Sequence, residues 1–229
     1  MRLCAREAHQ AELRTSSCER RPDDRELTRK PSEKHGLVAA AALGLGVLTS
    51  YAQGVLPHGL APLANSSGSW SLAAFLLAAT VRGGRTAAVA GPVALLMTVL
   101  GYDLGSLLRG FDASLGFTAF WLVAAVVVGT FLGLGGHALR HGTALAPLGA
   151  GAMGGVLVGE GAYGLLAIAD TTSPVYWTGS AVAGVALVVR AAAARFPRVR
   201  PALTAAATCA GTAALFVVVY RIGFFLLLP

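Results

Sequence analysis

A succession of apolar segments about 20 residues long, joined by short polar links, is the feature that most constrains this chain. A helix of about 20 apolar residues spans the hydrocarbon core of a bilayer. Hydrophobic residues make up 55% of the sequence and charged residues only 13%, against roughly 25% charged residues in a soluble domain. The sequence therefore predicts an all-α, polytopic transmembrane helical bundle surrounded by a lipid bilayer.

The segments predict about seven helices. They cover residues 36–56, 60–81, 86–108, 115–136, 145–169, 176–189 and 202–220. The second segment is unusual, because only its latter part, from Trp70 to Val81, is continuously apolar. We expect this helix to be broken or kinked in its outer half, and if it is only re-entrant the number of crossings is six.

Residues 1–35 differ in composition from the rest of the chain. They hold nine basic and seven acidic side chains, two prolines and no apolar periodicity, which is typical of disorder. We predict a cytoplasmic, largely disordered tail at 1–35 and a transmembrane domain at 36–229. Because this tail is nearly neutral and the other basic residues stand at predicted helix ends, the net charge of +7 does not indicate a nucleic-acid partner.

The placement of arginine predicts the orientation of the chain. With the tail inside and seven crossings, two arginines face outward, Arg109 and Arg221, and seven face inward: Arg82, Arg85, Arg140, Arg190, Arg195, Arg198 and Arg200. Short cytoplasmic loops carry an excess of Lys and Arg. We therefore predict a multi-pass protein of the bacterial inner (cytoplasmic) membrane with a cytoplasmic N-terminus, and residues 36–81 must then cross twice.

A polar run, Asn65-Ser66-Ser67-Gly68-Ser69, interrupts the second predicted helix and is closed by Trp70. Irregular backbone at membrane depth is tolerated only against protein or a wet cavity, and discontinuous helices form solute sites in many transporters. We predict that Asn65, Ser66, Ser67 and Trp70 line a ligand-binding cavity. The alternative is an outer loop with Trp70 as an interfacial anchor.

Glu160 is the only acidic residue well inside a predicted span. A buried carboxylate costs several kcal/mol unless it is paired or hydrogen-bonded, so such residues are candidates for function. No Lys or Arg lies at the same depth, and we expect its partner to be a hydroxyl, an amide, water or a ligand cation. Gln53 and Asp103 complete the predicted ligand-binding set, as parts of an acidic vestibule; the structural alternative is a carboxyl group hydrogen-bonded to Ser or Thr of a neighbouring helix.

Gly151, Gly155 and Gly159 follow one another at intervals of four residues in the fifth predicted helix. Such a smooth ridge indicates close helix packing in lipid. The ridge supports the prediction of a helical bundle. It is also compatible with assembly of the protein with a membrane partner subunit.

No signature of an enzyme, a metal site or a cofactor site stands out. The sequence lacks metalloprotease, nucleophile-elbow, P-loop and dinucleotide-binding motifs. His137 and His141 lie four residues apart, but no carboxylate or cysteine is near them in sequence, so we predict neither a metal nor a cofactor and no enzymatic activity.

The run Leu63-Ala64-Asn65-Ser66, closed by Trp70, resembles the LANSxxxW signature of an uncharacterised family of small bacterial multi-pass membrane proteins. The segments Ala74-Phe75-Leu76-Leu77, Arg82-Gly83-Gly84-Arg85 and Gly101-Tyr102 fit the same pattern. The short helices and glycine ridges are also similar, more weakly, to the substrate-binding membrane subunits of energy-coupling-factor vitamin transporters. That second resemblance implies a solute-binding role.

Two functions are therefore open for this integral membrane protein. The first is binding or transport of a small solute through an outward-facing polar cavity. The alternative is a structural or partner-assembly protein without a solute site.

Overall fold

The computed structural model describes residues 31–112 and 115–227, and within these ranges every regular element is a helix. The long helices are α3 (Pro31–Ala52), α5 (Gly84–Leu108), α6 (Leu115–His141), α7 (Ala146–Ala167), α8 (Pro174–Arg195) and α9 (Val199–Leu227). Between α3 and α5 stand the short 3-10 helix η1 (Ala61–Asn65) and the short helix α4 (Ser67–Ala79). The predicted all-α transmembrane bundle is confirmed.

Six helices are long and apolar enough to cross a membrane, namely α3 and α5 to α9. The second predicted helix is broken, as expected. Ser66 is extended (φ −102°, ψ 124°) and separates η1 from α4. The 13 residues of α4 extend over only about 20 Å, less than the roughly 30 Å hydrocarbon core. η1 and α4 together therefore take the place of one full span.

Several helix boundaries differ from the sequence prediction. The helices α6, α8 and α9 are longer than the segments predicted at 115–136, 176–189 and 202–220, and both ends of the first helix are shifted. α3 begins at Pro31 and ends at Ala52, so residues 31–35 are helical and the polar end of the predicted first helix lies in a turn. Residues 53–60, which contain Gly54, Pro57 and Gly59, form turns in place of further helix. Of the tail predicted at residues 1–35, residues 1–30 lie outside the described residues.

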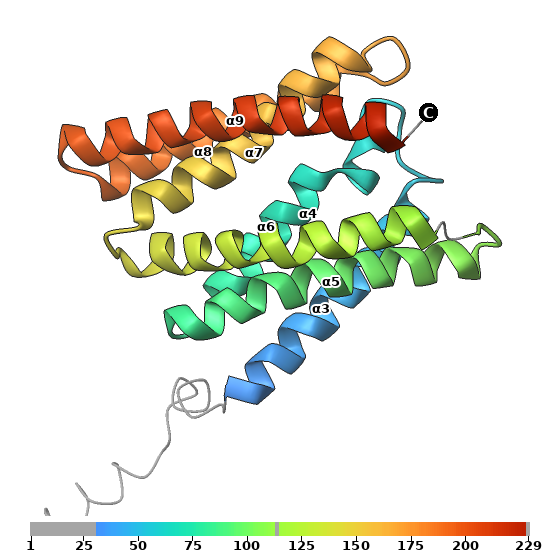
Figure 1. Cartoon of the computed structure of the whole chain (residues 1–229), viewed down its shortest axis with the longest axis horizontal. Coiled ribbons are helices and arrows are strands. Elements are labelled where there is room, and N and C mark those ends of the chain that lie inside the picture. Colours follow the sequence, from blue (N-terminus) through green and yellow to red (C-terminus); the bar gives the residue numbers. More distant parts are fainter. Residues whose placement is uncertain (1–30, 113–114, 228–229) are drawn as a thin grey trace, which may run out of the picture.

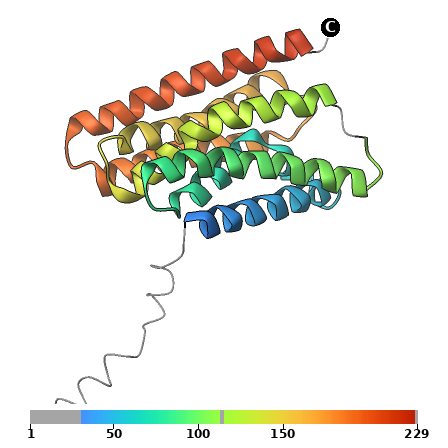
Figure 2. The ribbon, with the colours of Figure 1, turned by 60° about the horizontal axis from the view of Figure 1, so that its bottom comes forward.

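The short helix α4 lies inside the bundle. It contacts α3, α5, α6 and α7, while α9 runs along one outer side and α3 along the opposite side (Figures 1 and 2). Its buried residues include Trp70, Ala74 and Phe75, which belong to the main apolar core. The broken helix is therefore a central element of the fold and not a surface loop.

Glycine allows the long helices to approach backbone to backbone. A Cβ at Gly129 of α6 would lie 2.6 Å from the nitrogen of Pro92 in α5, and a Cβ at Gly155 of α7 would lie 2.6 Å from the Cys209 carbonyl oxygen in α9. Without a large hydrophobic effect between helices in lipid, such close packing is a principal source of association.

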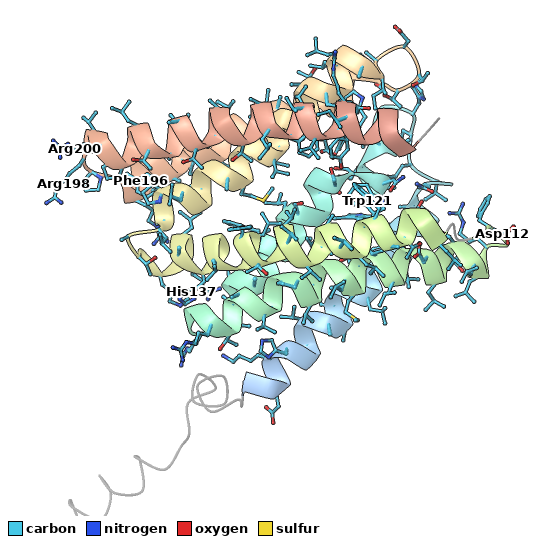
Figure 3. All side chains as sticks on the ribbon, in the orientation of Figure 1. Asp112, Trp121, His137, Phe196, Arg198 and Arg200 are labelled. Carbon is cyan, nitrogen blue, oxygen red and sulfur yellow. The ribbon has the colours of Figure 1, made fainter. Side chains whose placement is uncertain are left out.

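The two ends of the bundle differ in charge. Successive helices run in opposite directions, so the start of α3, the α6–α7 connection and the α8–α9 connection share one end (Figure 1). Arg198 and Arg200 lie at that end and Asp112 at the other (Figure 3). We refer to these as the arginine-rich end and the opposite end.

Candidate functional site: a buried carboxylate at the start of a broken helix

Glu160 lies on the one face of α7 that is turned toward α4. Successive helical residues point about 100° apart. A Cβ at Gly159 would lie 2.7 Å from Phe216 Cβ of α9, and a Cβ at Gly161 would lie 2.8 Å from Ala181 Cβ of α8. The glycines on either side of Glu160 therefore let two neighbouring helices close in, and the carboxylate, only 4% exposed, reaches the third.

The start of α4 receives this carboxylate. Ser66 is the N-cap residue of α4, and its hydroxyl accepts a hydrogen bond from the Ser69 backbone N–H at 2.9 Å. The backbone N–H of Gly68 donates to Glu160 Oε1 at 2.9 Å. The first N–H groups of a helix have no partner within the helix, so Glu160 supplies from α7 an acceptor that α4 lacks.

Gly68 is the residue that permits this contact. A Cβ at position 68 would overlap Glu160 Oε2 and lie 3.0 Å from Glu160 Cδ. The carboxylate thus rests directly on the α4 backbone. Only glycine accommodates that approach without a shift of one of the two helices.

Hydroxyl groups surround the rest of the carboxylate. Ser66 Oγ lies 2.9 and 2.8 Å from its two oxygens and donates to them, and Ser67 Oγ donates to Oε1 at 3.1 Å. From α8, Ser180 Oγ lies 3.4 Å and the Tyr176 hydroxyl 3.5 Å from Oε2. The expected hydroxyl and amide partners of Glu160 are therefore confirmed.

Ser66 is the junction of this network. Its single proton is directed to Glu160, while its oxygen accepts from the Ser69 backbone and from the Tyr176 hydroxyl, the latter at 2.5 Å. One donor and two acceptor positions are the full capacity of a hydroxyl. The network links η1, α4, α7 and α8 at a single buried point.

The electrostatic compensation comes from dipoles and not from a cation. Each hydrogen-bond partner that the described residues give Glu160 is an uncharged hydroxyl or amide. A helix N-terminus carries a partial positive charge of about half an elementary charge, which favours an anion there by about 0.3 to 2 kcal/mol. The site holds a carboxylate whose counter-charge is spread over α4.

Aromatic side chains lie on the α9 side of the network. Tyr220 interacts with the Ser67 side chain, and its ring stacks on Phe216 with centroids 4.2 Å apart. The rings of Tyr163 and Trp121 lie 5.3 and 6.3 Å from that of Tyr220. Tyr220 thus joins the polar start of α4 to a group of aromatic rings from α6, α7 and α9.

The other predicted site residues do not join Glu160. Asn65 and Gln53 are exposed, and neither contributes a hydrogen bond to the network. Trp70 packs on Tyr102 with ring centroids 5.3 Å apart, and its buried Nε1 has no hydrogen-bond partner among the described residues. Asp103 accepts from Thr118 Oγ1 at 2.8 Å, which ties α5 to α6.

Four residues of the site escaped sequence reasoning: Gly68, Tyr176, Ser180 and Tyr220. A partial signal was present. Tyr176 and Ser180 are four residues apart and therefore share a helix face, and Ser66 stands three residues before Ser69, as an N-cap hydroxyl does before the N–H that it accepts. Tyr176 also follows a proline-containing loop, where an aromatic residue is typical of an interfacial anchor, so its sequence context does not indicate a buried partner.

Metal binding finds no support in the histidines. His137 and His141 lie with ring centroids 4.2 Å apart, and His141 Nδ1 is 3.0 Å from the His137 carbonyl oxygen. Across residues 31–112 and 115–227, no group of three or more His, Cys, Asp or Glu side chains is placed to hold a metal ion.

Comparison with known proteins places the chain in a family. Residues 25–223 match a family described as a family of unknown function (DUF6518). The chain belongs to this family. The matched range includes the whole Glu160 network, from Ser66 to Tyr220.

No curated protein and no solved structure matches the chain. The prediction of an uncharacterised family is thereby confirmed in its general form. The LANSxxxW signature and the similarity to energy-coupling-factor subunits stay predictions from the sequence.

Proposed function

We propose that this membrane protein binds a small, positively charged solute beside Glu160 and serves its binding or transport across the membrane. The observation that carries the proposal is the position of the only buried carboxylate among the described residues, at the N-terminus of a helix that starts inside the bundle.

Broken helices have a recurring role in membrane transport. In secondary transporters, discontinuous helices meet the solute near the middle of the bilayer, where half-helix ends and free backbone groups contact it. Ionisable residues inside membrane spans are rare and mark solute and ion pathways. η1, Ser66 and α4 provide the break, and Glu160 provides the ionisable group.

The charge of the site favours a cation as its solute. The carboxylate is the one charged group of the network, and no basic side chain of residues 31–112 or 115–227 donates to it. An ammonium group supplies both N–H donors and the missing positive charge. The rings of Tyr220, Tyr163 and Trp121 add aromatic faces, which attract organic cations by about 0.5 to 2 kcal/mol each.

Orientation is part of the same proposal. The arginine excess at one end favours a cytoplasmic position for that end, in a bacterial inner membrane. The N-terminus is then cytoplasmic, and Glu160, which stands in the latter half of α7, lies nearer the outer side.

A ligand screen by thermal shift tests the proposal. The purified chain is heated in mild detergent with ethanolamine, choline and putrescine, and separately with acetate and succinate at equal ionic strength. We expect at least one of the cations to raise the midpoint temperature of thermal unfolding of the wild-type protein, and the anions to leave that temperature unchanged. Glu160→Gln removes the response, measured as the shift from the variant's own midpoint.

Asp103→Asn is the matched control, because it also removes one carboxylate but leaves the Glu160 network intact. Tyr220→Phe keeps the charge and loses only a hydroxyl, so it retains part of the response. The proposal fails if no cation shifts wild type, or if Glu160→Gln responds as wild type does.

The alternative, a structural or partner-assembly protein, has one observation in its favour. The chain's own donors already saturate the carboxylate. Under this alternative Glu160 serves only to join α4 to α7, and the screen gives no shift. The Gly151, Gly155 and Gly159 ridge does not supply the partner surface, because α9 of the same chain occupies it.

A further inference from the structure

A pocket of about 220 Å³ lies at the arginine-rich end, far along the bundle from Asp112 and its neighbours. It is formed by the connection from α6 to α7 and the connection from α8 to α9. The residues that bear on its chemistry are Thr143, Pro147, Arg195, Phe196, Arg198 and Pro201.

The charge of the pocket is positive. Arg195 and Arg198 line it and none of its lining residues is acidic. Arg195 Nη1 lies 3.4 Å from the carbonyl oxygen of Arg140, the last-turn residue of α6, which keeps its guanidinium beside the pocket. Among the described residues, Glu33 is the one acidic residue near this end, and it lies on α3, on the other side of the bundle from α9 (Figure 1).

Two helix starts border the same pocket. α7 begins at Ala146, and its N-cap residue Leu145 offers no side-chain hydrogen bond. α9 begins at Val199, between the lining residues Arg198 and Pro201. The Ala146 N–H donates to the Thr143 carbonyl oxygen, so the backbone adds to the attraction of the arginines for an anion through the partial positive charge of the helix starts.

The surface next to the pocket is apolar. Phe196 is a wall of the pocket, and directly along α9 stand Val199 and Leu203, which are 73% and 62% exposed. A soluble phosphate compound would contact only the basic pocket. A molecule with an anionic headgroup and a hydrocarbon tail would contact both the basic pocket and the apolar surface beside it. The volume is also below the roughly 300 to 1,000 Å³ of pockets that enclose drug-sized solutes, and suits a headgroup.

We propose that this pocket binds the phosphate headgroup of an anionic phospholipid, whose acyl chains lie along the exposed face of α9. Guanidinium groups form paired hydrogen bonds with phosphate oxygens, and basic pockets between transmembrane helices bind anionic headgroups in this way. The site is independent of Glu160, and it requires no assumption about which side of the membrane the arginine-rich end faces.

Lipid retention of the full chain tests this. The protein in mild detergent is titrated with phosphatidylglycerol and, separately, with phosphatidylcholine of the same acyl chains, and bound lipid is measured by native mass spectrometry. We expect preferential retention of phosphatidylglycerol. Because each basic residue near an anionic headgroup contributes about fivefold, Arg195→Gln with Arg198→Gln lowers that retention by about 25-fold.

Arg82→Gln with Arg85→Gln is the matched control, since it removes the same charge from the same end but outside the pocket. It leaves retention within about twofold of wild type. If the double pocket variant does not fold, Arg198→Gln alone serves, because this side chain is exposed, and its expected loss is about fivefold.

Three outcomes overturn the proposal. Equal retention of phosphatidylglycerol and phosphatidylcholine shows that the protein does not discriminate between lipids by the charge of the headgroup. Equal losses in the pocket and control variants show diffuse surface attraction without a site. A third arm uses glycerol 3-phosphate, and thermal stabilisation by this compound equal to that by phosphatidylglycerol identifies a soluble phosphate as the ligand.

Discussion

The environment of Glu160 follows from the smallest residues around it. Gly159 and Gly161 let α9 and α8 approach α7, and Gly68 lets the carboxylate touch the backbone of α4. An uncompensated carboxylate in the membrane interior costs several kcal/mol. The structure meets that cost with hydroxyls, one amide and a helix N-terminus, so the site depends on close approach as much as on charge.

Gly68→Ala is expected to lower the thermal midpoint of the protein. The added Cβ overlaps the carboxylate, so the Gly68 N–H and the Ser66 hydroxyl lose their acceptor or α4 must shift. A lost buried hydrogen bond of this kind costs about 1 to 3 kcal/mol, or several degrees in a chain of this size. Thermal unfolding in detergent, followed by circular dichroism, measures the change.

Gly179→Ala provides the control for that substitution. Nothing lies within 4 Å of a Cβ at Gly179 of α8, and alanine in a helix interior is favoured over glycine by about 0.5 to 1 kcal/mol. Its midpoint should equal or exceed that of wild type. Equal effects of the two substitutions would contradict the direct contact between Glu160 and the α4 backbone.

Sequence alone could identify part of this site. Glu160, Ser66 and Ser67 stand out because polar residues are scarce in apolar segments. Tyr176 and Tyr220 do not, since aromatic residues near the ends of spans are common as interfacial anchors. Gln53 was predicted to share the site, but α3 ends at Ala52 and the following turns leave Gln53 exposed; where a helix ends depends on tertiary contacts that periodicity does not contain.

At the scale of elements, α4 and α7 form the centre of the molecule. The sequence predicted the break in the second helix from its polar run, because unpaired backbone at membrane depth needs a partner. It could not show that the partner sits on α7, since pairing between residues 92 to 94 positions apart leaves no local pattern. The glycine ridge was readable as a packing surface, but the sequence left open whether α9 or another chain covers it.

Gly155→Leu is therefore expected to disrupt folding and not merely association. A Cβ at Gly155 would lie 2.6 Å from the Cys209 carbonyl oxygen and 2.6 Å from Thr212 Cβ, so a leucine forces α7 and α9 apart. Overpacking of a close contact costs about 1 to 3 kcal/mol or more. The yield of monodisperse protein after size-exclusion chromatography, with the thermal midpoint, measures the loss.

Gly211→Leu is the counterpart on α9. Position 211 has open space around its Cβ and faces away from α7, so leucine there should leave both yield and midpoint near wild type. If Gly211→Leu is as damaging as Gly155→Leu, the face of α9 that carries Gly211 is covered by another subunit, which would favour the partner-assembly alternative.

At the scale of the whole molecule, the helices run in alternating directions, and two sites of opposite charge lie toward different ends of the bundle. The opposite end lies nearer the broken helix with its carboxylate and aromatic rings, and the arginine-rich end holds the basic pocket. This separation depends on η1 and α4 together crossing the bundle, because a re-entrant segment would place Arg82 and Arg85 at the end opposite to the start of α3. The arrangement of the helices puts these residues at the same end as the start of α3 (Figure 1).

Labelling of single cysteines tests the separation and the orientation together. In a background without Cys4, Cys18 and Cys209, Asp112→Cys and Arg198→Cys are treated in intact cells with a membrane-impermeant maleimide. Because the arginine-rich end is expected to face the cytoplasm, only Asp112→Cys should react, and Arg198→Cys should react after the membrane is permeabilised. The reverse pattern would show that the arginines face outward, while reaction of both in intact cells would place the two ends on one side and contradict the three crossings by α6, α7 and α8 that separate Asp112 from Arg198.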